Sequence, residues 1–220
     1  MLIDEKVEQI KWKLTEFSEH VVEMLSLSIK GLVERNREYL DRVIKDYEPR
    51  CNNLELEIDE MCISFIAQFS PRAKHLRTIF TALKMNNDLE RMGDHIVNIS
   101  QSAIFLIDKP PVKPLIDLPR MADEVKKMLS DSVKSFIDEN AELAKSVCER
   151  DDVIDALREQ IVRELITYMI SDPSTIERAL HLVRISGNLE RIADLSTNIC
   201  EDVIFIVKGE LMKHHKVVKF

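Results

Sequence analysis

Oxygen-bearing side chains recur at four-residue spacing in two stretches of this chain, and the two stretches lie 100 residues apart. Side chains at i, i+4 and i+8 of an α-helix lie one above another, so each stretch predicts a file of oxygen atoms along one helix face. Carboxylate and amide oxygens are the ligands that hard cations prefer, such as magnesium, calcium, manganese or oxidised iron. The members of the two files are Glu90, Asp94 and Asn98 in the first stretch and Glu190, Asp194 and Asn198 in the second.

A third acidic file with the same spacing precedes the second of these stretches. It consists of Asp151, Asp155 and Glu159, and the corresponding first-half pair is Glu48 with Asn52, followed by Glu55 and Asp59. If antiparallel helices bring these files beside the first two, several carboxylates converge in each half. Like charges held close together favour binding of a cation that neutralises them. We therefore predict metal sites on the chain.

A solvated helix surface is the alternative explanation for each file taken alone. Arg91 and Arg191 stand beside the acidic residues, and exposed ion pairs of this kind contribute only about 0.2 to 0.5 kcal/mol each. Glu, Asp and Asn are nevertheless identical in the two halves, whereas position 95 is His and position 195 is Leu. This internal comparison favours a shared constraint, and a helical scaffold without metal remains the rival hypothesis.

Catalysis has no specific support in the sequence. It contains no Gly-rich phosphate loop and no nucleophile elbow, and the Glu-x-x-His motif of di-iron bundles is missing from both oxygen files. His20, His75, His95 and His181 are scattered, and none lies four residues from another, which excludes a His-x-x-x-His zinc site. We predict no catalytic residue, and a metal-dependent hydrolase or oxidase stays as a second alternative.

The repeat also predicts the domain organisation. An offset of 100 residues is too long for a solenoid unit and fits a duplicated bundle of helices, and a chain with only four glycines suits a helical fold. The stretch 109–114 contains three prolines, which cannot continue a helix, and Pro49 is expected to kink or break an earlier helical segment. We expect an all-α protein with a first bundle at 1–108, a linker at 109–118, a second bundle at 119–209 and a basic tail at 210–220.

Composition limits the partners and the compartment. Acidic residues outnumber basic ones by 39 to 31, and the net charge of -8 argues against nucleic-acid binding. The four cysteines, Cys51, Cys62, Cys148 and Cys200, form no Cys-x-x-Cys pair and suit a reducing compartment. No uncharged run reaches the roughly 18 apolar residues of a membrane span, and no secretion signal is recognised. We therefore expect a cytosolic location.

Small residues on the first long helix allow close packing. Ser28 and Gly31 continue its apolar seam, and such residues let two helices approach closely, either within a bundle or across a dimer. We favour packing within the chain, and a homodimer remains an alternative.

Both oxygen files lie in segments that resemble the PhoU family, the cytoplasmic regulators of bacterial phosphate uptake. The residues that carry the resemblance are Leu89-Glu90-Arg91-Met92-Gly93-Asp94, Leu189-Glu190-Arg191-Ile192-Ala193-Asp194, Leu165-Ile166-Thr167-Tyr168-Met169 and Ile58-Asp59-Glu60. The resemblance covers nearly the whole chain, from the first long helix to about Gly209. It implies two three-helix bundles in tandem, each bearing a surface metal cluster on Glu/Asp-x-x-x-Asp motifs.

The resemblance also implies a function and assigns the site residues. It implies restraint of phosphate-starvation signalling through contact with the phosphate transporter's ATPase subunit and a membrane histidine kinase, which would place the protein at the inner face of the membrane through its partners. Glu90, Asp94, Glu190 and Asp194 match the third-helix motifs of the family, Asp151 and Asp155 match the middle-helix motif, and Glu48 and Asn52 are the first-half counterpart. That counterpart departs from the pattern, because Asn52 replaces a carboxylate and Pro49 interrupts the segment.

Overall fold

The computed structural model describes residues 2–208, 211–213 and 216–218 of the chain, and helices dominate it. Gly209, the predicted end of the second bundle, lies outside the described residues. So do His214 and His215 of the predicted basic tail. The elements in chain order are α1 (Leu2–Val33), α2 (Arg37–Arg42), the π-turn η1 (Val43–Tyr47), α3 (Glu48–Phe69), α4 (Ala73–Ile107), α5 (Asp117–Ile137), α6 (Ala141–Cys148), α7 (Asp151–Ser171), the 3-10 turn η2 (Pro173–Thr175), α8 (Ile176–Lys208), β1 (Leu211–Lys213) and β2 (Lys216–Val218).

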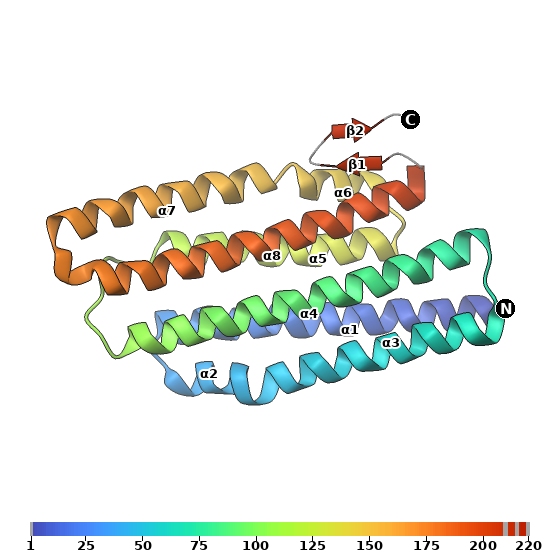
Figure 1. Cartoon of the computed structure of the whole chain (residues 1–220), viewed down its shortest axis with the longest axis horizontal. Coiled ribbons are helices and arrows are strands. Elements are labelled where there is room, and N and C mark those ends of the chain that lie inside the picture. The colour runs from blue at the N-terminus through green and yellow to red at the C-terminus, as the bar shows by residue number, and fades with distance from the viewer. Residues whose placement is uncertain (1, 209–210, 214–215, 219–220) are drawn as a thin grey trace.

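The long helices form two bundles in tandem, as the repeat predicted. Helices α1, α3 and α4 pack together in the first half, and α5, α7 and α8 pack together in the second, with α6 added against α8. Figure 1 shows α3, α4, α8 and α7 side by side in one layer, with α1 and α5 behind them. Because α4 runs antiparallel to α8 and α1 runs antiparallel to α5, an approximate two-fold axis perpendicular to this layer relates the halves.

Apolar periodicity explains why the helices pack in this way. The buried residues of α1 alternate spacings of three and four from Val7 to Leu25, which gives one continuous apolar stripe facing α3 and α4. The small residues of α1 are used inside the chain: the Ser100 hydroxyl of α4 donates a hydrogen bond of 2.9 Å to the Ser28 hydroxyl. A Cβ at Gly31 would lie 2.6 Å from the Leu40 side chain. Both residues therefore serve intramolecular packing.

Pro49 does not break the second helical segment. Helix α2 passes through the π-turn η1 directly into α3, and Pro49 lies in the first turn of α3, where its missing N–H is tolerated. The Nε2–H of His20 donates a hydrogen bond of 2.9 Å to the Tyr47 carbonyl at this turn, and the two rings stack with centroids 5.1 Å apart. The expected interruption is therefore confined to one π-helical turn.

The linker and the tail differ in detail from the sequence expectation. Helix α5 begins at Asp117, so Pro119 lies within its first turn. Lys113 anchors the linker by ion pairs to Asp117 and to Glu164 of α7. In the tail, β1 and β2 pair as a short antiparallel hairpin beside the end of α8. Within the described part of the chain, no helix is long and apolar enough to span a membrane.

Candidate metal sites

The first-half cluster lies in the groove between α3 and α4. Glu55 of α3 stands beside Glu90 and Asp94 of α4, and burial raises the pKa of both glutamates. The neighbouring carboxylates raise these pKa values further, with Asp94 acting on both. Among the described residues, none donates a side-chain hydrogen bond or forms an ion pair with these three carboxylates. The cluster therefore presents negative charge without a bound positive partner.

Asn86 fixes the helix register at this groove. Its side chain is fully buried, and Nδ2 donates hydrogen bonds of 2.9 Å to the Glu55 backbone carbonyl and to Oδ1 of Asp59. Those two acceptors set the orientation of the amide, because a flipped amide would place two oxygens together. Oδ1 of Asn86 is left without a hydrogen-bond partner in the described structure. An unpartnered buried oxygen beside an acidic cluster is what a bound cation or its water would satisfy.

The 100-residue offset gives a different first-half counterpart of Asp151 and Asp155 from the one that the motif predicts. At an offset of 100 residues those positions are Cys51 and Glu55, not Glu48 and Asn52. Cys51 is buried against α4, and burial together with the charges of Glu90 and Asp94 raises the pKa of its thiol to about 12. Glu48, which precedes Cys51 on α3, also raises the pKa of this thiol by its charge. Asn52 is exposed. Neither side chain makes a hydrogen bond or ion pair among the described residues.

The Gly93–Cys51 contact explains a difference between the two signature segments. A Cβ at Gly93 would lie 2.6 Å from Sγ of Cys51, closer than real atoms approach, whereas the second half has Ala193. We expect Gly93→Ala to lower the free energy of unfolding by about 1 to 3 kcal/mol despite the better helix propensity of Ala. Adding Cys51→Ala should recover most of this loss, as a double-mutant cycle by urea denaturation will measure. Additive effects would show that the contact is not the cause.

The second-half cluster lies in the corresponding groove between α7 and α8. Glu190 and Asp194 of α8 face Asp155 of α7, and burial raises the pKa of both α8 carboxyls. Here arginines compensate the charge: Nε of Arg158 lies 3.3 Å from Glu190, and Nη1 of Arg191 lies 3.4 Å from Asp194. The second half has the more complete set of acidic residues in the sequence. In the structure, however, more of its negative charge is compensated by arginines than in the first half.

The remaining predicted ligands lie at the margins of these clusters. Asn98 and Asn198 are exposed one turn beyond the aspartates, and Glu159 is exposed on α7. Asp151 is buried at the start of α7, where its charge acts on Cys148. Within the described residues, no three His, Cys, Asp or Glu side chains already converge on one point at coordinating distance. Metal binding would thus require the flexible glutamates to change rotamer.

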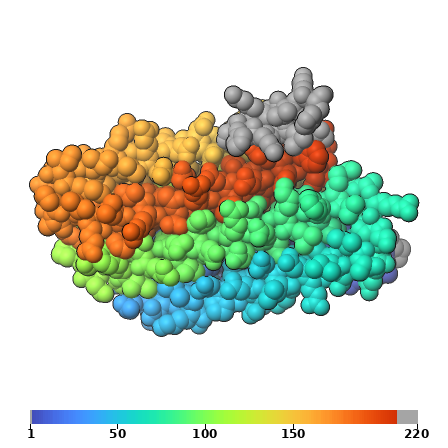
Figure 2. All heavy atoms as spheres, in the orientation of Figure 1, coloured from blue at the N-terminus to red at the C-terminus, as the bar shows by residue number. Residues whose placement is uncertain are grey.

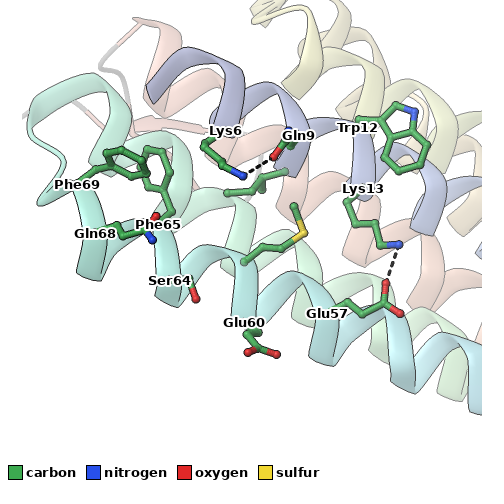
Figure 3. Close-up of a pocket in the computed structure, with 12 residues that line it drawn as sticks. Lys6, Gln9, Trp12, Lys13, Glu57, Glu60, Ser64, Phe65, Gln68 and Phe69 are labelled. Carbon is green, nitrogen blue, oxygen red and sulfur yellow. Dashed lines mark hydrogen bonds and ion pairs between the residues drawn. The ribbon is translucent and has the colours of Figure 1, made fainter. Parts of the chain in front are cut away.

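A separate hollow of about 520 Å³ lies between α1 and α3, and none of the predicted metal ligands lines it. Figure 3 shows Lys6, Gln9, Trp12 and Lys13 on one side and Glu57 to Phe69 on the other, with the Lys13–Glu57 ion pair of 2.6 Å closing one end. At the corresponding place in the second half, linker residues 113–116 and the start of α5 cover α7 and leave a space of only about 10 Å³. The hollow is therefore a feature of the first half.

Comparison with known proteins decides the family. The sequence model described as "PhoU domain" matches the chain twice, at residues 14–103 and 118–203. The chain belongs to the PhoU family. It is similar to the phosphate-specific transport system accessory protein PhoU homolog of Aquifex aeolicus, with 39% identity over 99% of this chain and 98% of the relative. The corresponding homolog 2 of Thermotoga maritima is 36% identical over 100% of this chain and 94% of the relative.

A solved structure confirms the fold of the PhoU family for this chain. The crystal structure of PhoU from Pseudomonas aeruginosa matches with a TM-score of 0.89 at 29% identity, over 94% of this chain and 99% of that chain. The family resemblance stated from the sequence and the all-α architecture are both confirmed. The metal ligands are placed by the structure but remain predictions.

Proposed function

We propose that this protein regulates phosphate uptake by restraining the phosphate transporter and the two-component signalling that responds to phosphate starvation. One observation carries the proposal: relatives that match along nearly their whole length are named phosphate-specific transport system accessory proteins. Both PhoU domains are present, and their order and spacing fit the solved PhoU fold. The names describe accessory proteins and state no catalytic activity, which supports regulation by binding.

The partners in this proposal are the transporter's ATPase subunit and a membrane sensor histidine kinase. Contact with them would hold the protein in the cytosol at the inner face of the membrane. The net charge of -8 favours protein partners that carry basic patches. It disfavours nucleic acid as a partner, because it opposes binding to phosphate backbones. Self-association into a homodimer is compatible with this role and is a separate question.

Bound metal is the second part of the proposal. Glu55, Glu90 and Asp94 would hold a hard cation in the first half, and Asp155, Glu190 and Asp194 would hold one in the second. The donor set suits iron, manganese, magnesium or calcium, because it consists of oxygen atoms. Such an ion would neutralise the carboxylates whose charges now raise the pKa values of Glu55 and Glu90, and it would fix the α3/α4 and α7/α8 grooves in one arrangement.

A metal-free scaffold is the second candidate function, and one observation favours it. Arg158 and Arg191 already pair with Glu190 and Asp194, so the second-half cluster is partly neutralised without any cation. In that case the acidic grooves would contact basic side chains of a partner directly.

A deletion strain tests the regulatory role. We expect loss of the gene to raise phosphate uptake and to switch on a phosphate-starvation reporter in phosphate-rich medium. Restoring the gene should return both readouts to the parental level. Unchanged uptake and an unchanged reporter in the deletion strain would contradict the proposal, whatever metal the protein binds.

A further inference from the structure

Large apolar side chains are exposed at equivalent positions near the end of each helical hairpin. We call the two sets the tip clusters. They comprise Ile66, Leu76 and Phe80 in the first half, exposed by 37%, 43% and 64%, and Ile166, Ile176 and Leu180 in the second half, exposed by 47%, 42% and 46%. Each member lies 100 residues from its counterpart. Exposed apolar side chains do not stabilise a folded chain. Their recurrence at three equivalent positions therefore indicates that a partner covers them.

Shared ancestry of the halves does not explain this recurrence. Neighbouring exposed positions on the same helices have changed character: Ile63 is exposed by 62%, but its counterpart is Arg163. Ile170 is exposed by 77%, and its counterpart is Ser70. Charge has changed sign as well, from Arg77 to Glu177. The tip clusters kept their apolar character where adjacent surface did not.

Each tip cluster lies in the same groove as an acidic cluster, nearer the hairpin turn. Ile66 follows Asp59 by seven residues on α3 and so shares its face, while the Asn86–Asp59 hydrogen bond sets a register that places Ile66 level with Ile79 and Phe80 of α4. Phe80 and Asp94 also share the exposed side of α4, since fourteen residues span nearly four turns. The duplicated positions repeat this arrangement between α7 and α8.

An aromatic residue from the opposite half extends each cluster. Phe105 near the end of α4 stacks on His181 of α8, next to Leu180, with ring centroids 3.9 Å apart. The same antiparallel register, seen in the Lys84–Asp202 ion pair, places Phe205 of α8 opposite Thr81, the residue that follows Phe80 on α4. Phe205 is exposed by 42%. Each half therefore places a phenylalanine on the helix turn that carries the other half's tip cluster.

Both clusters belong to one face of the molecule and lie at opposite ends of it. The α3/α4 turn lies at one end of the layer in Figure 1 and the α7/α8 turn at the other, and the space-filling view in Figure 2 shows this layer as one continuous face. Helices α1 and α5 both lie behind the layer, so the exposed sides of α4 and α8 point the same way. The approximate two-fold axis thus exchanges the two tip clusters.

We propose that the two tip clusters bind the same apolar surface of two identical partner subunits, so that one chain engages two copies. The inference rests on the proposed function and assigns this face to the transporter's ATPase subunit. Charge complementarity defines the partner's chemistry: its apolar contact is bordered by basic side chains, because the three carboxylates of each groove keep a net negative charge even after one divalent cation binds. An anionic membrane is disfavoured, because the same face carries both acidic clusters.

Calorimetric titration with the purified ATPase subunit of the same organism's phosphate transporter tests the stoichiometry. We expect two subunits per wild-type chain. Phe80→Ser and Leu180→Ser should each weaken one of the two sites by at least about tenfold, and the double variant should lose both. Each residue is exposed, so the fold is expected to persist, as far-ultraviolet circular dichroism will check.

Matched controls come from apolar residues that do not recur. Leu56→Ser and Val153→Ser remove comparable exposed apolar area on α3 and α7, more than two turns from Ile66 and Ile166, and should leave both sites intact. One subunit per chain, or unchanged binding by the double variant, would overturn the inference and leave the proposed function standing. If the wild-type chain binds no ATPase subunit, the partner assignment fails along with the inference. Binding to phosphatidylglycerol vesicles that the double variant loses would replace the protein partner with a lipid surface.

Discussion

Asp88→Asn is expected to raise the free energy of unfolding at pH 7 by up to about 3 kcal/mol. Asp88 is only 8% exposed, and burial raises its pKa from 3.8 to about 6, although Arg91 lies 3.4 Å away and opposes the shift. One pKa unit corresponds to about 1.4 kcal/mol, so ionising this carboxyl in the folded protein costs about 3 kcal/mol. Asn keeps the shape and removes that cost.

The sign of the pH dependence follows from the same shift. The carboxyl of Asp88 stays protonated up to about pH 6 in the folded protein but ionises near 3.8 in the unfolded chain. The stabilisation that protonated Asp88 contributes to the wild-type fold is therefore fully present below pH 3.8. It is lost as the pH rises through 6. Urea denaturation at pH 4 and pH 7 should show a small difference between wild type and Asp88→Asn at pH 4 and the full gain at pH 7. An equal difference at both values would contradict the assignment.

The two-fold arrangement supplies a control for this prediction. The position equivalent to Asp88 is Asn188, whose Oδ1 accepts a hydrogen bond of 2.9 Å from Nδ1 of His95. The position equivalent to His95 is Leu195, which is buried and cannot donate a hydrogen bond. Asn188→Asp would place its new carboxylate within hydrogen-bond distance of the His95 ring, which already donates to this position. We therefore expect Asn188→Asp to destabilise the protein much less at pH 7 than ionised Asp88 does in the wild type.

The fold could be predicted because it depends on information that lies within each helix. Apolar spacing marked the long helices, and the 100-residue repeat marked the two bundles. Pro49 showed the limit of such local rules, since a π-turn absorbs the proline without a break. The sequence also does not show which apolar side chains are exposed to solvent. Ile79 and Phe80 both fit the apolar pattern, yet Ile79 is fully buried and Phe80 is 64% exposed. Only packing against α8 and α3 decides between them.

The site could be predicted in residue type but not in pairing. Four-residue spacing fixes which oxygens share a face, but it does not say which residue of the next helix stands opposite. Matching Glu48 and Asn52 to Asp151 and Asp155 by motif predicts a first-half pair that lies three residues before the pair given by the 100-residue offset. Carrying the 100-residue offset from Asp155 to α3 would have identified Glu55 directly. The compensation of Glu190 by Arg158 needs the helix register and could not be read from the sequence.

The first-half cluster is expected to hold metal more tightly than the second. Bringing a cation to Glu55, Glu90 and Asp94 neutralises charges that no arginine or lysine pairs with among the described residues, whereas binding at the second cluster must displace Arg158 and Arg191. We expect Glu90→Gln with Asp94→Asn to remove most of the metal that copurifies, and Glu190→Gln with Asp194→Asn to remove less. Elemental analysis of the gently purified proteins, followed by titration with Mn²⁺, measures both.

Single glutamate variants on α3 separate the two possible registers of the first-half site. Glu55→Gln should weaken Mn²⁺ binding by more than about tenfold, because Glu55 is electrostatically coupled to both Glu90 and Asp94. Glu48→Gln removes the same charge from the same helix and should change the affinity little. The reverse order would restore the motif-based pairing. If neither the wild type nor any variant retains metal after incubation with manganese, iron, magnesium or calcium, the grooves bind protein side chains directly, and the scaffold without metal becomes the better description.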